Sequence, residues 1–273
     1  MKRRALAAAA ILVLVPLSSV AAHDLYLKLN SYVLPASATR VRVPVLNGTF
    51  TTSEGSVAAD RVSAIVLAST AGRQTLSPDA WHSRRDSSFL TLALGAPGTY
   101  VVGAATRPRT ITLAPGDFAA YLRGEGLGHV LAARRDAGEA ERPARERYAK
   151  HVKAVFQKGA PRTAGFDAVL GHAAELVPIA NPYSLGVGDT LRLRALVNGR
   201  PAAGAVVIAG GTLPTGRAIA ARQLRADPAG LVHLPIVAPG RWYAKFIHIE
   251  RLVGDATADY ESRWATLTFG VRE

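Results

Sequence analysis

Histidine is the residue type in this sequence best suited to metal chemistry. The chain has seven histidines and no cysteine, so a thiolate site is impossible. Imidazole nitrogen binds copper, nickel and cobalt well. The sequence contains no His-x-His, no His-Glu-x-x-His and no histidine tract, which are the short ligand spacings of common metal motifs. Any metal site must therefore be assembled from residues that are far apart in the sequence.

His23 is the first candidate ligand, because it follows a segment that resembles a removable leader. Cleavage after Ala22 would let the new α-amine and the Nδ1 of His23 chelate one ion together. Cleavage after Ala21 would leave Ala22 ahead of His23, and the amine, one backbone amide and the imidazole could then hold copper or nickel in a planar site. The alternative is that His23 is an ordinary polar residue before the first strand.

His248 is the expected partner of His23 in such a site. It lies in a predicted strand, and by alternation one face of that strand carries Trp242, Ala244, Phe246 and His248. The alternative is a buried histidine that bonds to a backbone carbonyl.

His172 is a third candidate metal ligand. It lies just before Glu175 and could donate from the linker into the second domain. His151 is expected to be a poor ligand for a cation, because Lys150 and Lys153 flank it.

The first 22 residues predict export. Three basic residues, Lys2, Arg3 and Arg4, precede an apolar run at 5–17 and then small residues up to Ala22. This order is typical of a secretory signal peptide, and the run is too short for a membrane-spanning helix. We expect a mature chain in the periplasm without a transmembrane segment.

The net charge is +13, of which the leader supplies three, leaving +10. The arginines are scattered and the chain is exported, so nucleic acid is not an expected partner.

Apolar residues alternate with polar ones along most of the mature chain, which predicts strands with one buried face. Examples are the leucines at 25, 27 and 29, the valines at 41, 43 and 45, and the leucines at 191 and 193. Turns follow at Asn47-Gly48 and Pro97-Gly98, and again at Asn198-Gly199 and Pro239-Gly240. We therefore predict a mainly β chain with two consecutive Ig-like or transthyretin-like β-sandwich domains, at 23–114 and 161–273.

A helical hairpin is predicted between the two sandwiches, at 115–160. Phe118, Tyr121 and Leu122 recur at helical spacing, and a similar pattern continues to Leu131. A second helix is predicted from four residues at i, i+4, i+7 and i+8, which are Tyr148, Val152, Val155 and Phe156.

Several blocks of the sequence resemble an exported family of unknown function. They are His-Asp-Leu-Tyr-Leu at 23–27, Tyr-Leu-Arg-Gly-Glu-Gly-Leu at 121–127, the block at 146–154, Gly-His-Ala-Ala-Glu-Leu-Val-Pro at 171–178, Asn-Pro-Tyr at 181–183, Gly-Asp-Thr-Leu at 188–191, and the segments 242–248 and 259–269. The family is often labelled as the periplasmic component of nickel/cobalt transport. The resemblance covers essentially the whole mature chain, and it implies metal handling without naming a catalytic residue.

These observations lead to one main expectation and two alternatives. The expectation is a periplasmic accessory protein that binds nickel or cobalt, or copper, through His23, His248 or His172, and that works with an envelope metal transporter or outer-membrane receptor. The first alternative is a non-metal interaction module in which the helical hairpin docks on a transporter or receptor. The second is a copper oxidase with a histidine brace at His23. Serine-hydrolase, P-loop and dinucleotide motifs are absent from the sequence, so no catalytic residue is assigned.

Overall fold

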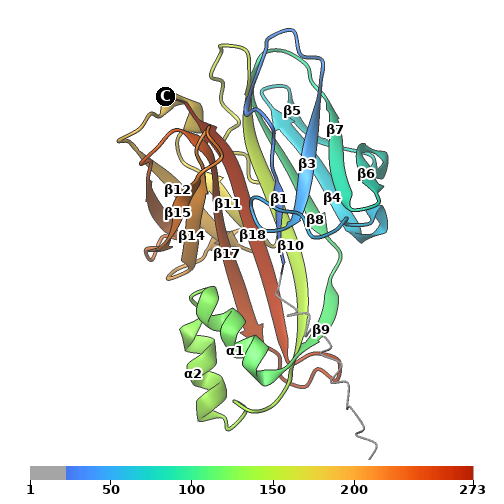
Figure 1. The fold of residues 1–273 in the computed structure, drawn as a ribbon, viewed down its shortest axis with the longest axis vertical. Helices are drawn as coiled ribbons and strands as arrows, with labels where there is room; N and C mark the ends of the chain where they lie inside the picture. The colour runs from blue at the N-terminus through green and yellow to red at the C-terminus, as the bar shows by residue number, and fades with distance from the viewer. Residues whose placement is uncertain (1–22, 273) are drawn as a thin grey trace, which may run out of the picture.

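The longest strands of the protein belong to one ten-stranded sheet that runs through both halves of the chain (Figure 1). The structure, a computed structural model, describes residues 23–272. The main path of the sheet is β15-β14-β17-β18-β10-β8-β4-β5. In that order the strands are Ala218–Arg225, Val206–Thr212, Gly240–Arg251, Tyr260–Val271, Ala144–Lys158, Gly98–Thr106, Val62–Ser69 and Gly72–Thr75. Two further strands pair with β10, namely β2 (Val33–Leu34) and β9 (Arg109–Leu113).

A four-stranded sheet packs on the part of the large sheet that contains β8 and β4, and this forms the first sandwich (Figure 1). Its order is β1-β3-β7-β6, with bounds Asp24–Leu27, Arg40–Gly48, Ser87–Ala93 and Trp81–Arg84. Leu90 and Leu92 of β7 are fully buried, as is Leu27 of β1. The predicted period of two is confirmed in β3 and β7, whereas in β1 Tyr26 is buried together with Leu25 and Leu27.

The second sandwich packs another four-stranded sheet on the part of the large sheet that contains β17 and β14 (Figure 1). The strands of this sheet are β11 (Ala174–Pro178), β12 (Thr190–Val197), β13 (Arg200–Pro201) and β16 (Leu231–Pro235). Leu191 and Leu193 of β12 are fully buried while Arg192 and Arg194 are exposed. The protein is thus mainly β and built from sandwiches, which confirms the predicted fold class.

Strands β10 and β18 join the two sandwiches. They pair in parallel from Glu146–Tyr260 to Ala154–Thr268, so one continuous sheet crosses from one half of the chain to the other. The sequence division into 23–114 and 161–273 therefore cuts through a shared sheet.

The second predicted helix is wrong, because residues 144–158 form the strand β10. From His151 to Lys158 every residue of this strand is buried. A strand that is buried on both faces carries apolar residues on both, so it loses the period of two and its spacing can imitate that of a helix. The β-branched Val152 and Val155 favour a strand at these positions.

The first predicted helix is present as two short helices, α1 (Pro115–Gly124) and α2 (Gly128–Asp136), which cover the far end of β17 and β18 (Figure 1). Gly126 has φ +72° and lies in the turn between them. Phe118 and Leu122 of α1 pack in a second core with Trp264 and Tyr260 of β18. No helix within residues 23–272 combines the length and apolar character needed to cross a membrane.

Candidate functional site

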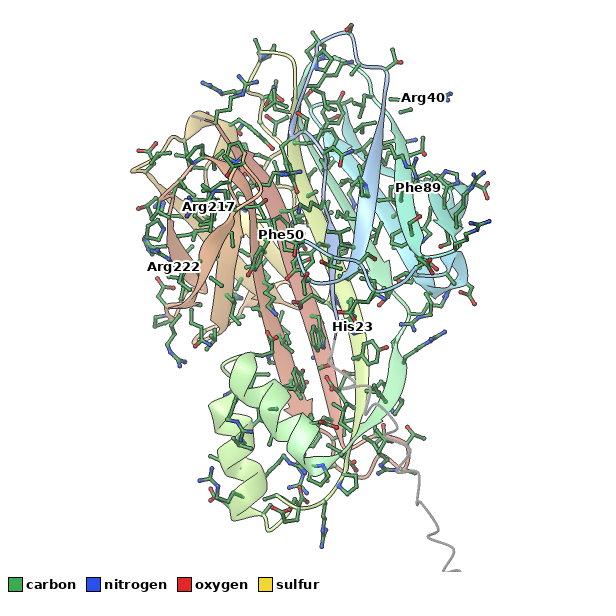
Figure 2. All side chains as sticks on the ribbon, in the orientation of Figure 1. His23, Arg40, Phe50, Phe89, Arg217 and Arg222 are labelled. Carbon is green, nitrogen blue, oxygen red and sulfur yellow. The ribbon has the colours of Figure 1, made fainter. Side chains whose placement is uncertain are left out.

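His23 lies immediately before β1, at the base of the first sandwich (Figure 2). Its Nε2 is 2.6 Å from Oε2 of Glu54, which belongs to the loop after β3. The His23 side chain is 34% exposed, so it is held in place but still reaches solvent. The Nζ of Lys150 in β10 donates a hydrogen bond to the His23 carbonyl oxygen. These two contacts fix both the backbone and the ring of His23.

The contact with Glu54 also selects the tautomer of the neutral His23 ring. A carboxylate accepts a hydrogen bond and cannot donate one when ionised, so the proton of a neutral ring lies on Nε2. This leaves the lone pair of Nδ1 available. A histidine that ligates a metal through one nitrogen commonly donates its other N–H to a carboxylate in the same way.

Asp24, the next residue, has one satisfied oxygen and one unsatisfied oxygen. Its Oδ2 accepts hydrogen bonds from Lys245 Nζ at 2.7 Å and from Tyr26 Oη at 2.9 Å. Its Oδ1 is buried and has no hydrogen-bond partner among the described residues. A buried acceptor without a partner is costly, by about 1–3 kcal/mol, and is therefore a position where a cation or donor would be favoured.

Lys245 bridges Asp24 to the helical region. Its Nζ lies 2.7 Å from Oε1 of Glu125 as well as from Asp24, and the side chain is 11% exposed. Burial lowers the pKa of this ammonium, but the two carboxylates outweigh burial and hold the pKa above its ordinary value. Lys245 is therefore charged and neutralises part of the negative charge of Asp24 and Glu125.

Lys150 is a second, partly buried ammonium near His23. Burial, aided by the positive charge of Arg61, lowers its pKa to about 8, although Asp24 and Glu146 act in the opposite direction. Its Nζ also lies 5.6 Å from the ring centres of both Tyr148 and Trp264, at the outer range of a cation–π contact.

His248 does not lie with His23. Lys245, which contacts Asp24, precedes His248 by three positions on β17. Residues an odd number apart point to opposite faces of a strand, so His248 points away from the face that carries Lys245. The His248 Nε2 is paired at 2.8 Å with Oε1 of Glu250. Its side chain lines a surface cavity with His129 and Val206 on the side of the second sandwich. The expectation that His248 faces His23 is not met.

His172 lies at a third location, on the opposite face of β10 from Lys150. Its ring is 5.6 Å from the ring of His151, and both residues are buried. Burial lowers the pKa of His151 to about 4 and that of His172 to about 3, so both rings are neutral at pH 7. The Nδ1 of His151 lies 3.3 Å from the Trp264 carbonyl oxygen, while Nε2 of His172 has no partner among the described residues.

Beside the two histidines is a buried ion pair between Lys153 of β10 and Glu175 of β11. Both side chains are 1% exposed. Lys153 Nζ also donates to the Ala168 carbonyl at 2.9 Å, and Glu175 Oε1 accepts from the Leu170 amide at 2.6 Å. The sequence shows Lys153 only as a positive charge beside His151, and the structure gives it a carboxylate partner. Glu175 is 22 residues further along the chain, and no local pattern signals this pairing.

The metal-binding capacity of the described residues is limited. Within residues 23–272 no three His, Asp or Glu side chains are grouped as a ready metal site. His23 fits a metal best, because within residues 23–272 its Nδ1 has no hydrogen-bond partner while its Nε2 is held by Glu54. A complete site there would need a further ligand, such as a free α-amine at His23.

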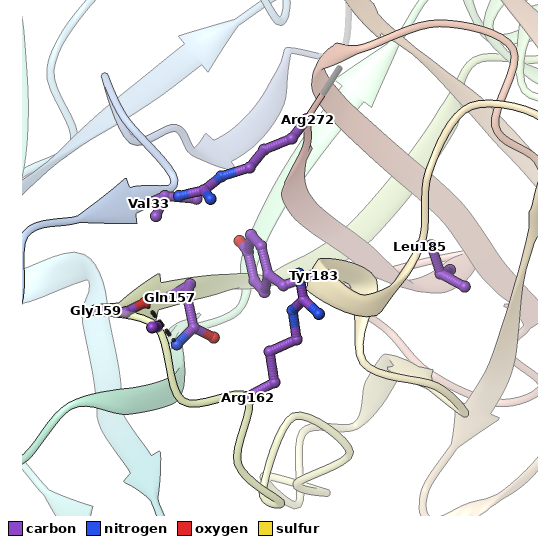
Figure 3. A pocket seen from close by; sticks show the side chains of 8 residues that line it. Val33, Gln157, Gly159, Arg162, Tyr183, Leu185 and Arg272 are labelled. Carbon is purple, nitrogen blue, oxygen red and sulfur yellow. Dashed lines mark hydrogen bonds between the residues drawn. The ribbon is translucent and has the colours of Figure 1, made fainter.

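A separate cavity of about 390 Å³ lies between the two halves of the chain at the opposite end from the helices (Figure 3). Arg162 and Arg272 border it from two different segments, with the ring of Tyr183 between them. The Tyr183 hydroxyl donates to the Val155 carbonyl at 2.6 Å, and Gln157 donates to the Gly159 carbonyl.

Comparison with known proteins gives a family without an assigned activity. No curated protein matches the chain. Among solved structures, a tetra-tandem repeat from the extending region of a large adhesion protein is 15% identical with a TM-score of 0.24, over 91% of this chain and 49% of that one. Escherichia coli alpha-2-macroglobulin activated by porcine elastase is 11% identical with a TM-score of 0.24, over 91% of this chain and 20% of that one. The chain thus spans about half and one fifth of these two proteins, and similarity at this level carries no functional argument. The model of one family matches residues 20–250, and the chain belongs to that family, which is described as a domain of unknown function (DUF4198).

Proposed function

We propose that the exported, processed chain binds a transition-metal ion at its N-terminus and serves metal uptake across the bacterial envelope. The observation that carries this proposal is the His23–Glu54 pair at 2.6 Å. A neutral ring with its proton on Nε2 presents Nδ1 as a ligand, and removal of residues 1–22 would place the α-amine of the same residue beside it.

The ligand set would consist of the α-amine and Nδ1 of His23. The Oδ1 of the next residue, Asp24, is buried and accepts no hydrogen bond from residues 23–272. Amine and imidazole nitrogens favour nickel, cobalt and copper over magnesium or calcium. Glu54 would act as the outer partner that orients the ring. His248 and His172 lie elsewhere and are not included in this site.

The proposed role is capture and delivery, not catalysis. A site with one side-chain nitrogen and a terminal amine keeps coordination positions open, so a bound ion could pass to an envelope metal transporter or an outer-membrane receptor. A copper oxidase with a histidine brace would need a second imidazole facing the N-terminus, and His248, the residue expected to supply it, points to the other face of β17.

The test is isothermal titration of nickel, cobalt and copper into the processed protein that begins at His23. We expect one-to-one binding that His23→Ala abolishes and that Glu54→Gln weakens by about 10–100-fold, as expected for loss of an outer carboxylate. His248→Ala is the matched control and is expected to bind normally. Absence of binding for all three ions, or full binding by His23→Ala, would refute the proposal.

A further inference from the structure

A second cavity lies close to His23, and it is lined mainly by basic and polar side chains. It has a volume of about 250 Å³. The side chains that matter for its chemistry are Arg61, Arg109, Lys150, Tyr148, Thr106 and Asn47. They come from separate strands and turns of the first sandwich and from β10, so the fold converges them from distant parts of the sequence. The cavity is smaller than the roughly 300–1,000 Å³ of sites for drug-sized ligands, which points to a small ligand.

Arg61 is incompletely satisfied in this cavity. One terminal nitrogen of its guanidinium donates to the Arg107 carbonyl at 3.2 Å. The Nε is buried and has no hydrogen-bond partner among the described residues. A charged donor that is removed from water without an acceptor is unfavourable, and an oxygen atom placed in the cavity would correct this.

Neither guanidinium group of the cavity is paired with a carboxylate of the described residues, and the two carboxylates whose charges act on Lys150, Asp24 and Glu146, have other hydrogen-bond partners. Within residues 23–272 neither Arg61 nor Arg109 has a carboxylate oxygen within 4 Å, and Lys150 uses its Nζ on a backbone carbonyl. The nearby carboxylate of Glu146 is already engaged, because its Oε1 accepts from Tyr121 at 3.1 Å and from Ser262. Three like charges thus surround one small space.

From this arrangement we infer that the cavity is a binding site for a small oxyanion, carrying a carboxylate or a phosphate group, held by Arg61, Arg109 and Lys150. Guanidinium groups bind such anions through paired N–H donors, and a lysine adds a point charge. The anion would accept from Arg61 Nε and reduce the repulsion between Arg61 and Lys150. The site goes beyond the proposed metal function and does not depend on it, because none of its three cations is a metal ligand.

The experiment is calorimetric titration of the metal-free processed protein with three separate probes: inorganic phosphate, acetate and citrate. We expect saturable one-to-one binding of at least one probe, weakened by added sodium chloride. Arg61→Gln is expected to weaken binding about tenfold or more, and Arg61→Lys, which keeps the charge but lacks Nε, is expected to weaken it less. Arg162→Gln removes a guanidinium from the separate cavity of Figure 3 and is the matched control, expected to bind normally.

The probes distinguish the two anion classes. Binding of phosphate alone assigns a phosphate-bearing ligand, and binding of acetate or citrate alone assigns a carboxylate. The inference is overturned if no probe binds, or if Arg61→Gln and Arg162→Gln bind as tightly as the unchanged protein. His23→Ala is expected to retain anion binding, so failure of the metal proposal and failure of this one give different results.

Discussion

Acidification is expected to destabilise the protein through the buried pair His151 and His172. Both rings are buried, and the pKa values of about 4 and about 3 lie below the ordinary value of 6.5. The folded protein therefore binds fewer protons than the unfolded chain between about pH 6.5 and pH 4. Stability is fully present above the unfolded pKa and is lost as the pH falls toward the folded values.

The magnitude follows from this difference in proton binding. Between pH 7 and pH 5 an unfolded histidine becomes protonated and a folded one does not, which costs about 2 kcal/mol per histidine. The two residues together are thus expected to remove about 4 kcal/mol, a large part of the stability of a typical domain. Because the rings are neighbours, protonating one would make protonating the other still harder in the folded state.

The assay is urea unfolding, followed by circular dichroism, at a series of pH values from 7 to 5. The variant His172→Leu removes one titrating group, whose Nε2 has no hydrogen-bond partner within residues 23–272. It is expected to lose about half of the histidine contribution to the pH dependence. His233→Gln, an exposed histidine on β16, is the control and should follow the unchanged protein. If His172→Leu and the unchanged protein show the same dependence on pH, the assignment of a buried neutral pair is refuted.

Three further predictions concern stability at neutral pH, each measured by urea unfolding. Lys153→Met should cost about 3–5 kcal/mol, because Glu175 is left buried and unpaired. The double variant with Glu175→Leu should recover much of that loss, and equal stability of the single and double variants would contradict this. Gly103→Ala should cost about 1–3 kcal/mol, since an added methyl group would lie 2.8 Å from a carbon of the His172 ring, and an unchanged midpoint would show that this region can relax. Tyr183→Phe should cost about 1–3 kcal/mol because the Val155 carbonyl loses its buried donor at 2.6 Å, while Tyr148→Phe, at a partly exposed tyrosine, should cost less.

The sequence predicts well the sandwich strands that have one buried face, such as β12. Leu191 and Leu193 alternate with exposed arginines, and this period of two survives in the fold. It does not predict β10, which is buried on both faces and carries a spacing that also suits a helix. Pairing of β10 with β18 joins residues more than 100 positions apart, and no local pattern encodes such a contact.

The candidate site could be predicted only in part. His23 stands out from its position after the predicted leader, but its partner Glu54 comes from a loop that the sequence leaves undefined. The alternation of the sequence shows which residues share a strand face with His248. It does not show which element packs against that face, so the expectation that His248 faces His23 had no support from packing. The neutral state of His151 depends on burial, which arises from packing of β10 against β11 and the linker and outweighs the opposite effect of the Glu175 charge.

The central claim is that the terminal amine and the ring of His23 bind one metal ion together. The most direct measurement is titration of nickel into two forms of the same chain, one with a free α-amine at His23 and one with that amine acetylated. Our account predicts tight one-to-one binding by the free form and a loss of about tenfold or more on acetylation, since one of the few ligands is removed. Equal affinity of the two forms would contradict it.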